Sequence, residues 1–334
     1  MAERPVILLT NPIHEAGVEI LAPHAELVTA ADTAPETLRH AAGEADGIIV
    51  RAQLPGDIVD HAPKLKGMVR HGVGLDFIPV DAATAKGVAV ANLPGCNTGA
   101  VAEYFFSALF HLRRPLYRLD AGLRAEGWNA GRGQASATAE VSGTTLGVIG
   151  LGAIGGRIAQ IATGGFGMRV LAKSRSRGHG LAGVEEVDLP DLFAQSDAVA
   201  VCCALTEETR GLVSGELIAR MKPGAVLVNM ARGPIVDSRA LREALEQGKL
   251  AGAALDVFDS HPLPEDDPLR GTPNLLLTPH SAAITSTSLR VMSVGAAEEM
   301  LRILRGERPA NLVNPEAWPA RQPKPQPDAT KVNP

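Results

Sequence analysis

Two side chains suited to anion binding and proton transfer come shortly after apolar runs that are typical of buried strands. Arg232 follows the run Ala225–Asn229, and its planar guanidinium can bind both oxygens of a carboxylate. His280 follows the run Leu275–Thr278, and an imidazole gains and loses protons near neutral pH. With a hydride donor beside them, these two residue types could reduce a 2-keto acid. A single histidine after a strand is more often structural, so other features must support this chemistry.

A glycine-rich segment between a strand-like run and a helical stretch offers a place for a dinucleotide. It contains the pattern G-x-G-x-x-G at Gly150, Gly152 and Gly155. The first glycine of such a loop makes a tight turn, the second lets the backbone approach a pyrophosphate, and the third packs the helix against the strand. The amides of Ala153 and Ile154 would then point at phosphate oxygens. The alternative is a tight turn that binds no nucleotide.

The residues after the next strand-like run indicate which nucleotide fits. An NAD site usually has Asp or Glu about 20 residues after the glycines, where it accepts from the ribose 2′-hydroxyl. Lys173 or Ser174 occupies that position here, and no acid follows until Glu185. Ser174 and Arg175 could hydrogen-bond a 2′-phosphate, which a carboxylate would repel. We therefore predict that NADP is preferred over NAD. The alternative is a solvated basic loop that binds NAD loosely.

Several further motifs occur in order along the chain. They are RHGVGLD (70–76), NLPGCN (92–97) with VAE (101–103), ALTEETRGLV (204–213), MKPGAVLVNMARGPIVD (221–237), GAALDVFDSHPLPEDDPL (252–269) and NLLLTPH (274–280). Together with the glycine loop, this set resembles the D-isomer-specific 2-hydroxyacid dehydrogenases. That family includes phosphoglycerate dehydrogenase, glyoxylate/hydroxypyruvate reductase and D-lactate dehydrogenase. The resemblance extends from about Val69 to Asn314.

The resemblance implies which residues act on the substrate. His280 would be the general acid/base, and Arg232 would anchor the substrate and polarise its carbonyl group. Further substrate contacts are implied for the backbone amides of Val73 and Gly74, acting as an anion nest, and for the side chains of Arg51 and Asn97. For Arg51, an ordinary surface charge is the alternative.

The resemblance also implies cofactor contacts beyond the glycine loop. They are expected at Leu205, Thr206, Ala231 and Asp256. Asp256 would accept from the nicotinamide carboxamide and so determine which face of the ring is presented. The alternative for Asp256 is a capping or turn role.

The chain departs from the family pattern beside His280. The family has Glu-Pro two residues after Leu-Asp-Val-Phe, and here His261 stands in place of that Glu. A carboxylate stabilises an imidazolium and raises its pKa, whereas a neutral imidazole does so less. We predict that His261 orients His280, and that reductase activity falls at lower pH than in Glu-containing relatives. The alternative is that His261 has no catalytic role in a proline-rich loop.

Composition excludes several other classes of protein. A length of 334 residues suggests two domains, and a net charge of -5 lacks the electrostatic footprint of a nucleic-acid binder. The three cysteines form neither a disulfide framework nor a zinc pattern, so we expect no metal. No apolar stretch reaches the ~18 residues of a membrane span. The N-terminus does not resemble a signal peptide, so we expect a cytoplasmic protein.

Short apolar runs alternate with longer amphipathic stretches, as is typical of parallel strands buried between helices. The runs are Val6–Thr10, Gly47–Arg51, Gly67–His71, Val88–Asn92, Thr145–Ile149, Arg169–Ala172, Ala198–Cys203, Ala225–Asn229, Ala253–Val257 and Leu275–Thr278. We therefore expect an α/β fold of two doubly wound parallel-sheet domains, a flavodoxin-like substrate domain and a Rossmann cofactor domain.

Two helical stretches are expected to connect these domains. One is Asn97–Arg113, with Thr98 as its cap, and the other is Thr287–Leu304, which would return the chain to the first domain. The substrate domain would then be discontinuous, with residues 1–98 and 287–320, and the NAD(P)-binding domain would comprise residues 99–286. The proline-rich polar tail, residues 321–334, is expected to be disordered.

The leading interpretation is a reductase of small 2-keto acids, or the reverse D-2-hydroxyacid dehydrogenase, with glyoxylate and hydroxypyruvate as the natural substrates to test. Leu54, Leu75 and Tyr104 would help to select the substrate side chain. The alternatives are a D-3-phosphoglycerate dehydrogenase and, in another class, a nucleotide-sensing corepressor, because a fold does not by itself determine activity. The resemblance further implies a homodimer formed through the cofactor domain.

Overall fold

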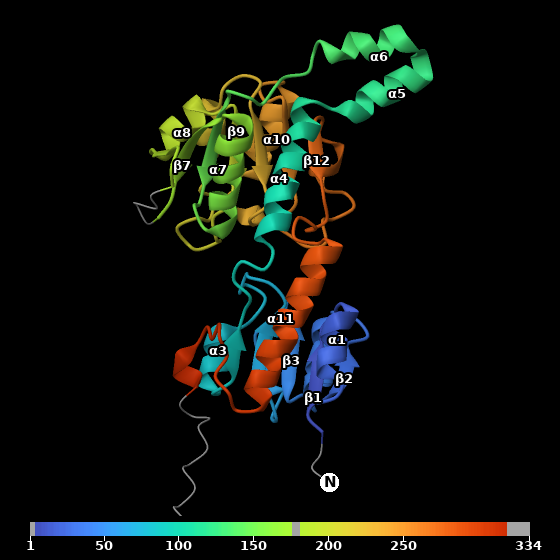
Figure 1. The fold of residues 1–334 in the computed structure, drawn as a ribbon, viewed down its shortest axis with the longest axis vertical. Helices are drawn as coiled ribbons and strands as arrows, with labels where there is room; N and C mark the ends of the chain where they lie inside the picture. Colours follow the sequence, from blue (N-terminus) through green and yellow to red (C-terminus); the bar gives the residue numbers. More distant parts are fainter. Residues whose placement is uncertain (1–3, 176–180, 319–334) are drawn as a thin grey trace, which may run out of the picture. The chain divides into compact units, whose positions relative to one another are not determined.

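The structure, a computed structural model, describes residues 4–175 and 181–318. The chain divides into two compact units. Unit 1 comprises Met1–Asn97 and Thr285–Pro334, and unit 2 comprises Thr98–Ile284 (Figure 1). The expected disordered tail, residues 321–334, lies outside the described residues.

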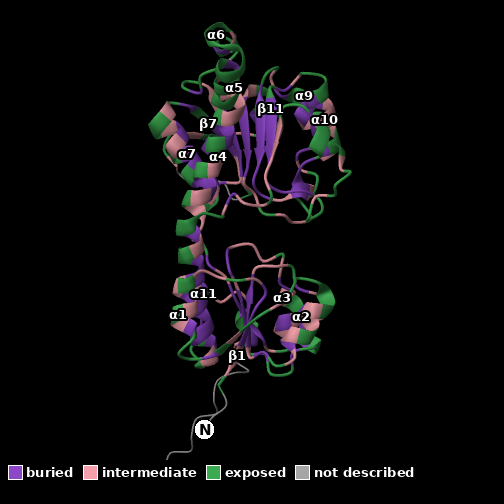
Figure 2. Cartoon of the chain, turned by 90° about the vertical axis from the view of Figure 1, so that its right-hand side faces the viewer, coloured by how far each residue is buried: buried purple, intermediate pink, exposed green. Residues whose placement is uncertain are grey.

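Unit 1 is built on a five-stranded parallel sheet with the order β2-β1-β3-β4-β5. The strands are β1 (Val6–Leu9), β2 (Glu26–Thr29), β3 (Gly47–Val50), β4 (Gly67–Arg70) and β5 (Ala89–Ala91). Helices α1 (Glu15–Leu21) and α11 (Ser286–Leu304) cover one face, and α2 (Pro35–Ala42) and α3 (Val80–Ala85) cover the other (Figure 2). This strand order is that of flavodoxin-like folds, so the predicted architecture is confirmed.

Helix α11 packs closely on this sheet because two strands begin with glycine. A Cβ atom on Gly47 would lie 2.3 Å from the sulfur of Met300, and one on Gly67 would lie 2.7 Å from Ile303. The helix starts at a capping box formed by Thr285 and Ser288, one residue before the predicted start.

Unit 2 is built on a seven-stranded parallel sheet with the order β12-β11-β10-β9-β6-β7-β8. The strands are β6 (Thr145–Ile149), β7 (Arg169–Lys173), β8 (Val184–Glu186), β9 (Ala198–Val201), β10 (Val226–Asn229), β11 (Gly252–Leu255) and β12 (Leu275–Leu277). Helices α4 (Thr98–Arg113) and α7 (Ala153–Phe166) pack on one face; α8 (Leu189–Gln195), α9 (Gly215–Arg220) and α10 (Ser238–Glu246) pack on the other. The predicted Rossmann sheet is confirmed, and the predicted strand β12 lies at one end of the strand order.

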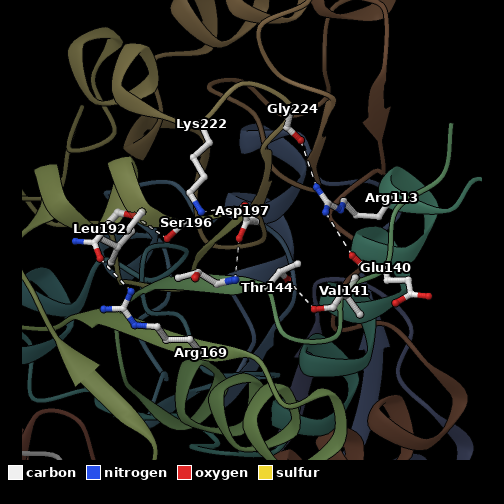
Figure 3. A network of polar contacts seen from close by, with 12 residues as sticks. Arg113, Glu140, Val141, Thr144, Arg169, Leu192, Ser196, Asp197, Lys222 and Gly224 are labelled. Atoms are coloured by element: carbon white, nitrogen blue, oxygen red, sulfur yellow. Dashed lines mark hydrogen bonds and ion pairs between the residues drawn. The ribbon is translucent and has the colours of Figure 1, made fainter.

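Polar contacts at the amino ends of these strands tie the sheet together (Figure 3). Asp197, just before β9, accepts from the amide of Thr145 at 2.9 Å and pairs with the amine of Lys222 at 3.0 Å. Arg113 at the end of α4 donates to the carbonyl of Gly224. These contacts join backbone segments to one another, so we interpret this end of the sheet as structural.

Some predicted elements differ from those in the structure. The sequence reading missed β2 and β8, which are exposed edge strands and therefore lack a continuous apolar run. The predicted cap of α4 is wrong, because Thr98 is the first helical residue and its buried hydroxyl has no hydrogen-bond partner among the described residues. Strand β9 ends at Val201, before the two cysteines.

Helices α5 (Leu116–Glu126) and α6 (Trp128–Ala135) were not predicted. They form a pair that extends away from the rest of unit 2 (Figure 1). Large apolar side chains on this pair are exposed, among them Trp128 at 68% and Leu116 at 63%. Among the described residues, no helix is long and apolar enough to span a membrane.

Candidate active site

The residues singled out from the sequence follow the carboxyl ends of parallel strands in both units. In unit 2, strands β6, β7, β9, β10, β11 and β12 lead to Gly150, Ser174, Leu205 with Thr206, Ala231 with Arg232, Asp256, and His280. In unit 1, β3, β4 and β5 lead to Arg51, Val73 with Gly74, and Asn97. Open α/β sheets bind their ligands beyond the carboxyl ends of the strands. Strand β6 lies at the point where the strand order reverses.

The glycine loop between β6 and α7 has the space that a dinucleotide needs. Gly150 has a φ of 96°, and a Cβ atom there would lie 2.8 Å from the backbone of Cys203. A Cβ on Gly155 would lie 1.9 Å from the carbonyl oxygen of Gly150, so only glycine lets α7 approach. A Cβ on Gly152 would meet nothing within 4 Å, and α7 begins without a side-chain cap. The residues present therefore fit a pyrophosphate at the start of α7.

The basic residues at the end of β7 and just after it have different surroundings. The amine of Lys173 pairs with the carboxylate of Asp188 at 2.6 Å. Ser174 is half-buried and Arg175 is exposed. No hydrogen bond or ion pair joins Arg175 to any described residue.

The turn that presents Arg232 is held by Asn229, a fully buried residue at the end of β10. The Oδ1 atom of Asn229 accepts from the amide of Ala231 at 3.0 Å, and its Nδ2 donates to the carbonyl of Arg232 at 2.9 Å. A Cβ on the next residue, Gly233, would lie 2.0 Å from the carbonyl carbon of Phe258. The loops after β10 and β11 are therefore in direct contact.

His280 lies in a loop that is wound around the carboxylate of Asp256. The two Asp256 oxygens accept from Thr278, Ser281 and Ala282, and the amide of His280 donates to the Asp256 carbonyl at 2.8 Å. The φ of His280 is 52°, in the left-handed region, which costs a non-glycine residue roughly 1–2 kcal/mol. Such strain persists only where surrounding contacts determine the conformation.

The structure brings His261 and His280 together. Their ring centroids are 5.3 Å apart, with an angle of 41° between the planes. The Nε2 atom of His261 accepts from the amide of Phe258 at 3.3 Å. An imidazole therefore stands beside His280, at the place where the family pattern has a carboxylate.

The loop after β4 in unit 1 leaves two consecutive amides facing away from the protein's own acceptors. The carbonyls of Gly72, Val73 and Gly74 accept from the amide of Leu93 at 2.9 Å, from Nδ2 of Asn92 at 2.8 Å and from Nε of Arg70 at 3.0 Å, respectively. The amides of Val73 and Gly74 donate to no acceptor among the described residues. Two such amides in succession form an anion-binding nest.

The other residues predicted to face the substrate differ in their contacts. Arg51 donates to the carbonyl of Pro12, and burial lowers the pKa of the Arg51 guanidinium. The buried Oδ1 of Asn97 has no partner among the described residues, as expected of an atom that a ligand would satisfy.

His71, in the same motif as Val73 and Gly74, is not suited to donate a proton. It is 4% exposed, and its Nε2 lies 2.8 Å from the hydroxyl of Ser293. Burial, with Arg51 and Arg70 nearby, lowers the pKa of His71 to about 3, so the ring is neutral near pH 7. In the described part of the chain, no group of three or more His, Cys, Asp or Glu side chains could hold a metal ion.

Three positioning residues were missed by the sequence reading. Asn229 and Thr278 are polar residues at the ends of apolar strands, and that placement is a usable signal. Arg70 contacts three backbone carbonyls, those of Val50, His71 and Gly74, and no sequence pattern shows such contacts.

Comparison with known proteins identifies what the chain is similar to. A family model described as "D-isomer specific 2-hydroxyacid dehydrogenase, NAD binding domain" matches residues 106–282. A glyoxylate reductase from Korarchaeum cryptofilum is 36% identical over 329 residues, which cover 96% of this chain and 99% of that protein. A D-3-phosphoglycerate dehydrogenase from Methanocaldococcus jannaschii is 37% identical over 92% of this chain, which spans 59% of its length.

Solved structures show the same similarity. An NADPH-dependent glyoxylate/hydroxypyruvate reductase from Sinorhizobium meliloti, solved with NADP and malonate, has a TM-score of 0.82 and 29% sequence identity. The match covers 96% of this chain and all of the other, so both units have counterparts in that protein.

Proposed function

Because the chain belongs to the D-isomer-specific 2-hydroxyacid dehydrogenase family, we propose that it reduces glyoxylate and hydroxypyruvate with NADPH as the preferred cofactor. The observation that carries this proposal is that three loops follow the carboxyl ends of strands in the unit 2 sheet. These loops contain the glycine pattern, Arg232 and His280, which are the parts that hydride transfer to a 2-keto acid requires. Similarity to glyoxylate reductases over nearly the whole chain supports the substrate class.

The residues divide the chemistry between them. The reduced nicotinamide supplies the hydride when it is bound. Arg232 binds the substrate carboxylate and draws electron density from the carbonyl group. His280 donates a proton to the carbonyl oxygen as it becomes a hydroxyl group.

A matrix of substrates and cofactors tests the proposed function. Glyoxylate, hydroxypyruvate, pyruvate and 3-phosphohydroxypyruvate are each assayed with NADPH and with NADH, by the loss of reduced-cofactor absorbance. We expect the highest kcat/KM for glyoxylate or hydroxypyruvate with NADPH. Turnover confined to the phosphorylated substrate would favour a D-3-phosphoglycerate dehydrogenase. No turnover in any combination would overturn the enzyme proposal and favour a nucleotide-sensing binding protein.

Replacing His261 by Glu is expected to extend reductase activity to higher pH. Reduction requires the protonated form of His280, so activity falls as pH rises through the apparent pKa of the pH–rate profile. A carboxylate close to an imidazolium raises such a pKa by roughly 1–3 units, and the imidazole of His261 supplies no negative charge. The measurement is kcat/KM for glyoxylate across a pH series.

The matched variant for this experiment is His261→Gln, because glutamine, like histidine, supplies no negative charge. We expect its descending limb to stay near that of the wild type. A His261→Glu profile with the wild-type apparent pKa would contradict the proposed role of His261.

We also propose that the protein is a homodimer that associates through α5 and α6. Leu116, Leu123 and Trp128 on this pair are large apolar side chains that are all exposed. A surface that carries several such side chains is typical of a protein–protein interface. Trp128→Glu is expected to convert the dimer to a monomer, measured by light scattering after gel filtration. Val291→Glu, at a half-exposed valine of α11, is the matched control and should remain dimeric. A monomeric wild type, or a dimeric Trp128→Glu variant, would contradict this proposal.

A further inference from the structure

The carboxylate of Asp256 accepts hydrogen bonds from the loop that carries His280. Asp256 is 1% exposed, and its Oδ1 accepts from the hydroxyl of Thr278 at 2.6 Å and from the amide of Ser281 at 2.7 Å. Its Oδ2 accepts from the amide of Ala282 at 2.9 Å. A carboxylate offers about four acceptor positions, so most of them are occupied from within unit 2.

A second hydroxyl extends these contacts to helix α4. The Oη atom of Tyr104 lies 2.7 Å from the hydroxyl oxygen of Thr278. Thr278 has a single hydroxyl proton, which it donates to Asp256, so Tyr104 must be the donor to Thr278. Burial raises the pKa of Tyr104 to about 12, so the phenol keeps the proton that it donates. The hydrogen bonds therefore run in one direction, from Tyr104 through Thr278 to Asp256.

Residues on both sides of His280 in the sequence make these contacts. Thr278 precedes it, Ser281 and Ala282 follow it, and all three bind the same carboxylate. The His280 amide itself donates to the Asp256 carbonyl at 2.8 Å. The left-handed φ of 52° at His280 is thus held from both flanks.

We propose that Asp256, with Tyr104 and Thr278 behind it, is the positioning residue that sets the backbone conformation and direction of His280. The inference rests on the proposed function, in which His280 donates the proton. It differs from the role in cofactor recognition that the resemblance implies for Asp256. It also gives Tyr104 a task other than selection of the substrate side chain.

The two roles of Asp256 predict different results. A positioning residue affects kcat, because a displacement of about 1 Å at a reacting group costs roughly 10²-fold in rate. A contact to the nicotinamide carboxamide affects the affinity for NADPH. In the variant Asp256→Asn, the amide NH₂ would face a backbone N–H wherever it is placed, so the loop would have to move.

Thr278→Val is the main test variant, because valine keeps the branched shape of threonine and replaces the hydroxyl with a methyl group that cannot donate to Asp256. Thr272→Val is its matched control: Thr272 is also buried near β12, but its hydroxyl donates to the carbonyl of Pro268 at 3.1 Å. Asp256→Asn and Tyr104→Phe complete the series. The measurements are kcat with glyoxylate, the Kd for NADPH by calorimetry, and amide hydrogen exchange in the peptide that contains Ser281 and Ala282.

We expect kcat to fall roughly 10²-fold in Asp256→Asn and by a smaller factor of about 10 in Thr278→Val, with the Kd for NADPH unchanged. Exchange at Ser281 and Ala282 should accelerate in both variants, and Thr272→Val should match the wild type in all three measurements. Tyr104→Phe should show the same pattern as Thr278→Val at smaller size.

The opposite pattern would overturn the proposal. That pattern is a weakened Kd for NADPH with kcat preserved in Asp256→Asn, or unchanged exchange in Thr278→Val. The exchange measurement needs no turnover. If the wild type reduced no 2-keto acid, the proposed function would fail, while faster exchange in Thr278→Val would still support the role of Asp256 in holding the loop.

Discussion

Replacement of His280 by Asn is expected to lower kcat for glyoxylate reduction by about 10²–10⁴-fold, the usual contribution of a positioned general acid. An amide cannot deliver a proton near neutral pH. Asparagine is the suitable replacement because it tolerates the left-handed backbone better than most residues, and the φ at this position is 52°. Calorimetry should show that the Kd for NADPH is retained, since the expected loss concerns proton transfer and not cofactor binding.

The matched control is His40→Gln, at an exposed histidine on α2 of unit 1. It should leave kcat at the wild-type value. A His280→Asn variant with nearly wild-type kcat would show that another group supplies the proton. His71 cannot be that group, because its pKa of about 3 leaves it neutral in the working range.

The sequence predicted the sheets and the residues at their carboxyl edges because both depend on local signals. Apolar runs without alternation marked the buried parallel strands, and each of the glycines at positions 150, 152 and 155 has the spacing that its role in the loop requires. Arg232 and His280 were found because each follows such a run. These are properties of single segments, so they can be read before any tertiary contact is known.

Other features of the site depend on contacts between distant segments, and the sequence did not predict them. The left-handed conformation of His280 arises from hydrogen bonds to Asp256, which lies 24 positions earlier in the chain. The buried Asn229 reads in the sequence as the end of an apolar strand, and only its two backbone contacts reveal that it shapes the turn before Arg232. The apolar residues of α5 and α6 are of types that are usually buried in a core, but they are exposed in the structure.

Cofactor preference should be decided by the residues at the carboxyl end of β7. We expect kcat/KM to be about 10- to 100-fold higher with NADPH than with NADH, since one hydrogen bond to a charged group contributes about 1.5–3 kcal/mol. Lys173 is already paired with Asp188 at 2.6 Å, so Arg175 is the better candidate for a 2′-phosphate. Ser174 lies between them and can add a hydroxyl donor.

Two substitutions in this loop should reverse the preference. Arg175→Ala removes the cation, and Ser174→Asp adds a carboxylate that repels a 2′-phosphate and accepts from a 2′-hydroxyl. If each effect is about 2 kcal/mol, the double variant should shift the ratio of kcat/KM values by about 10³-fold toward NADH. Arg169→Ala, at the opposite end of β7 where the arginine pairs with Glu185 at 2.7 Å, is the matched control. A wild type that prefers NADH, or a double variant with an unchanged ratio, would mean that this loop does not select the nucleotide.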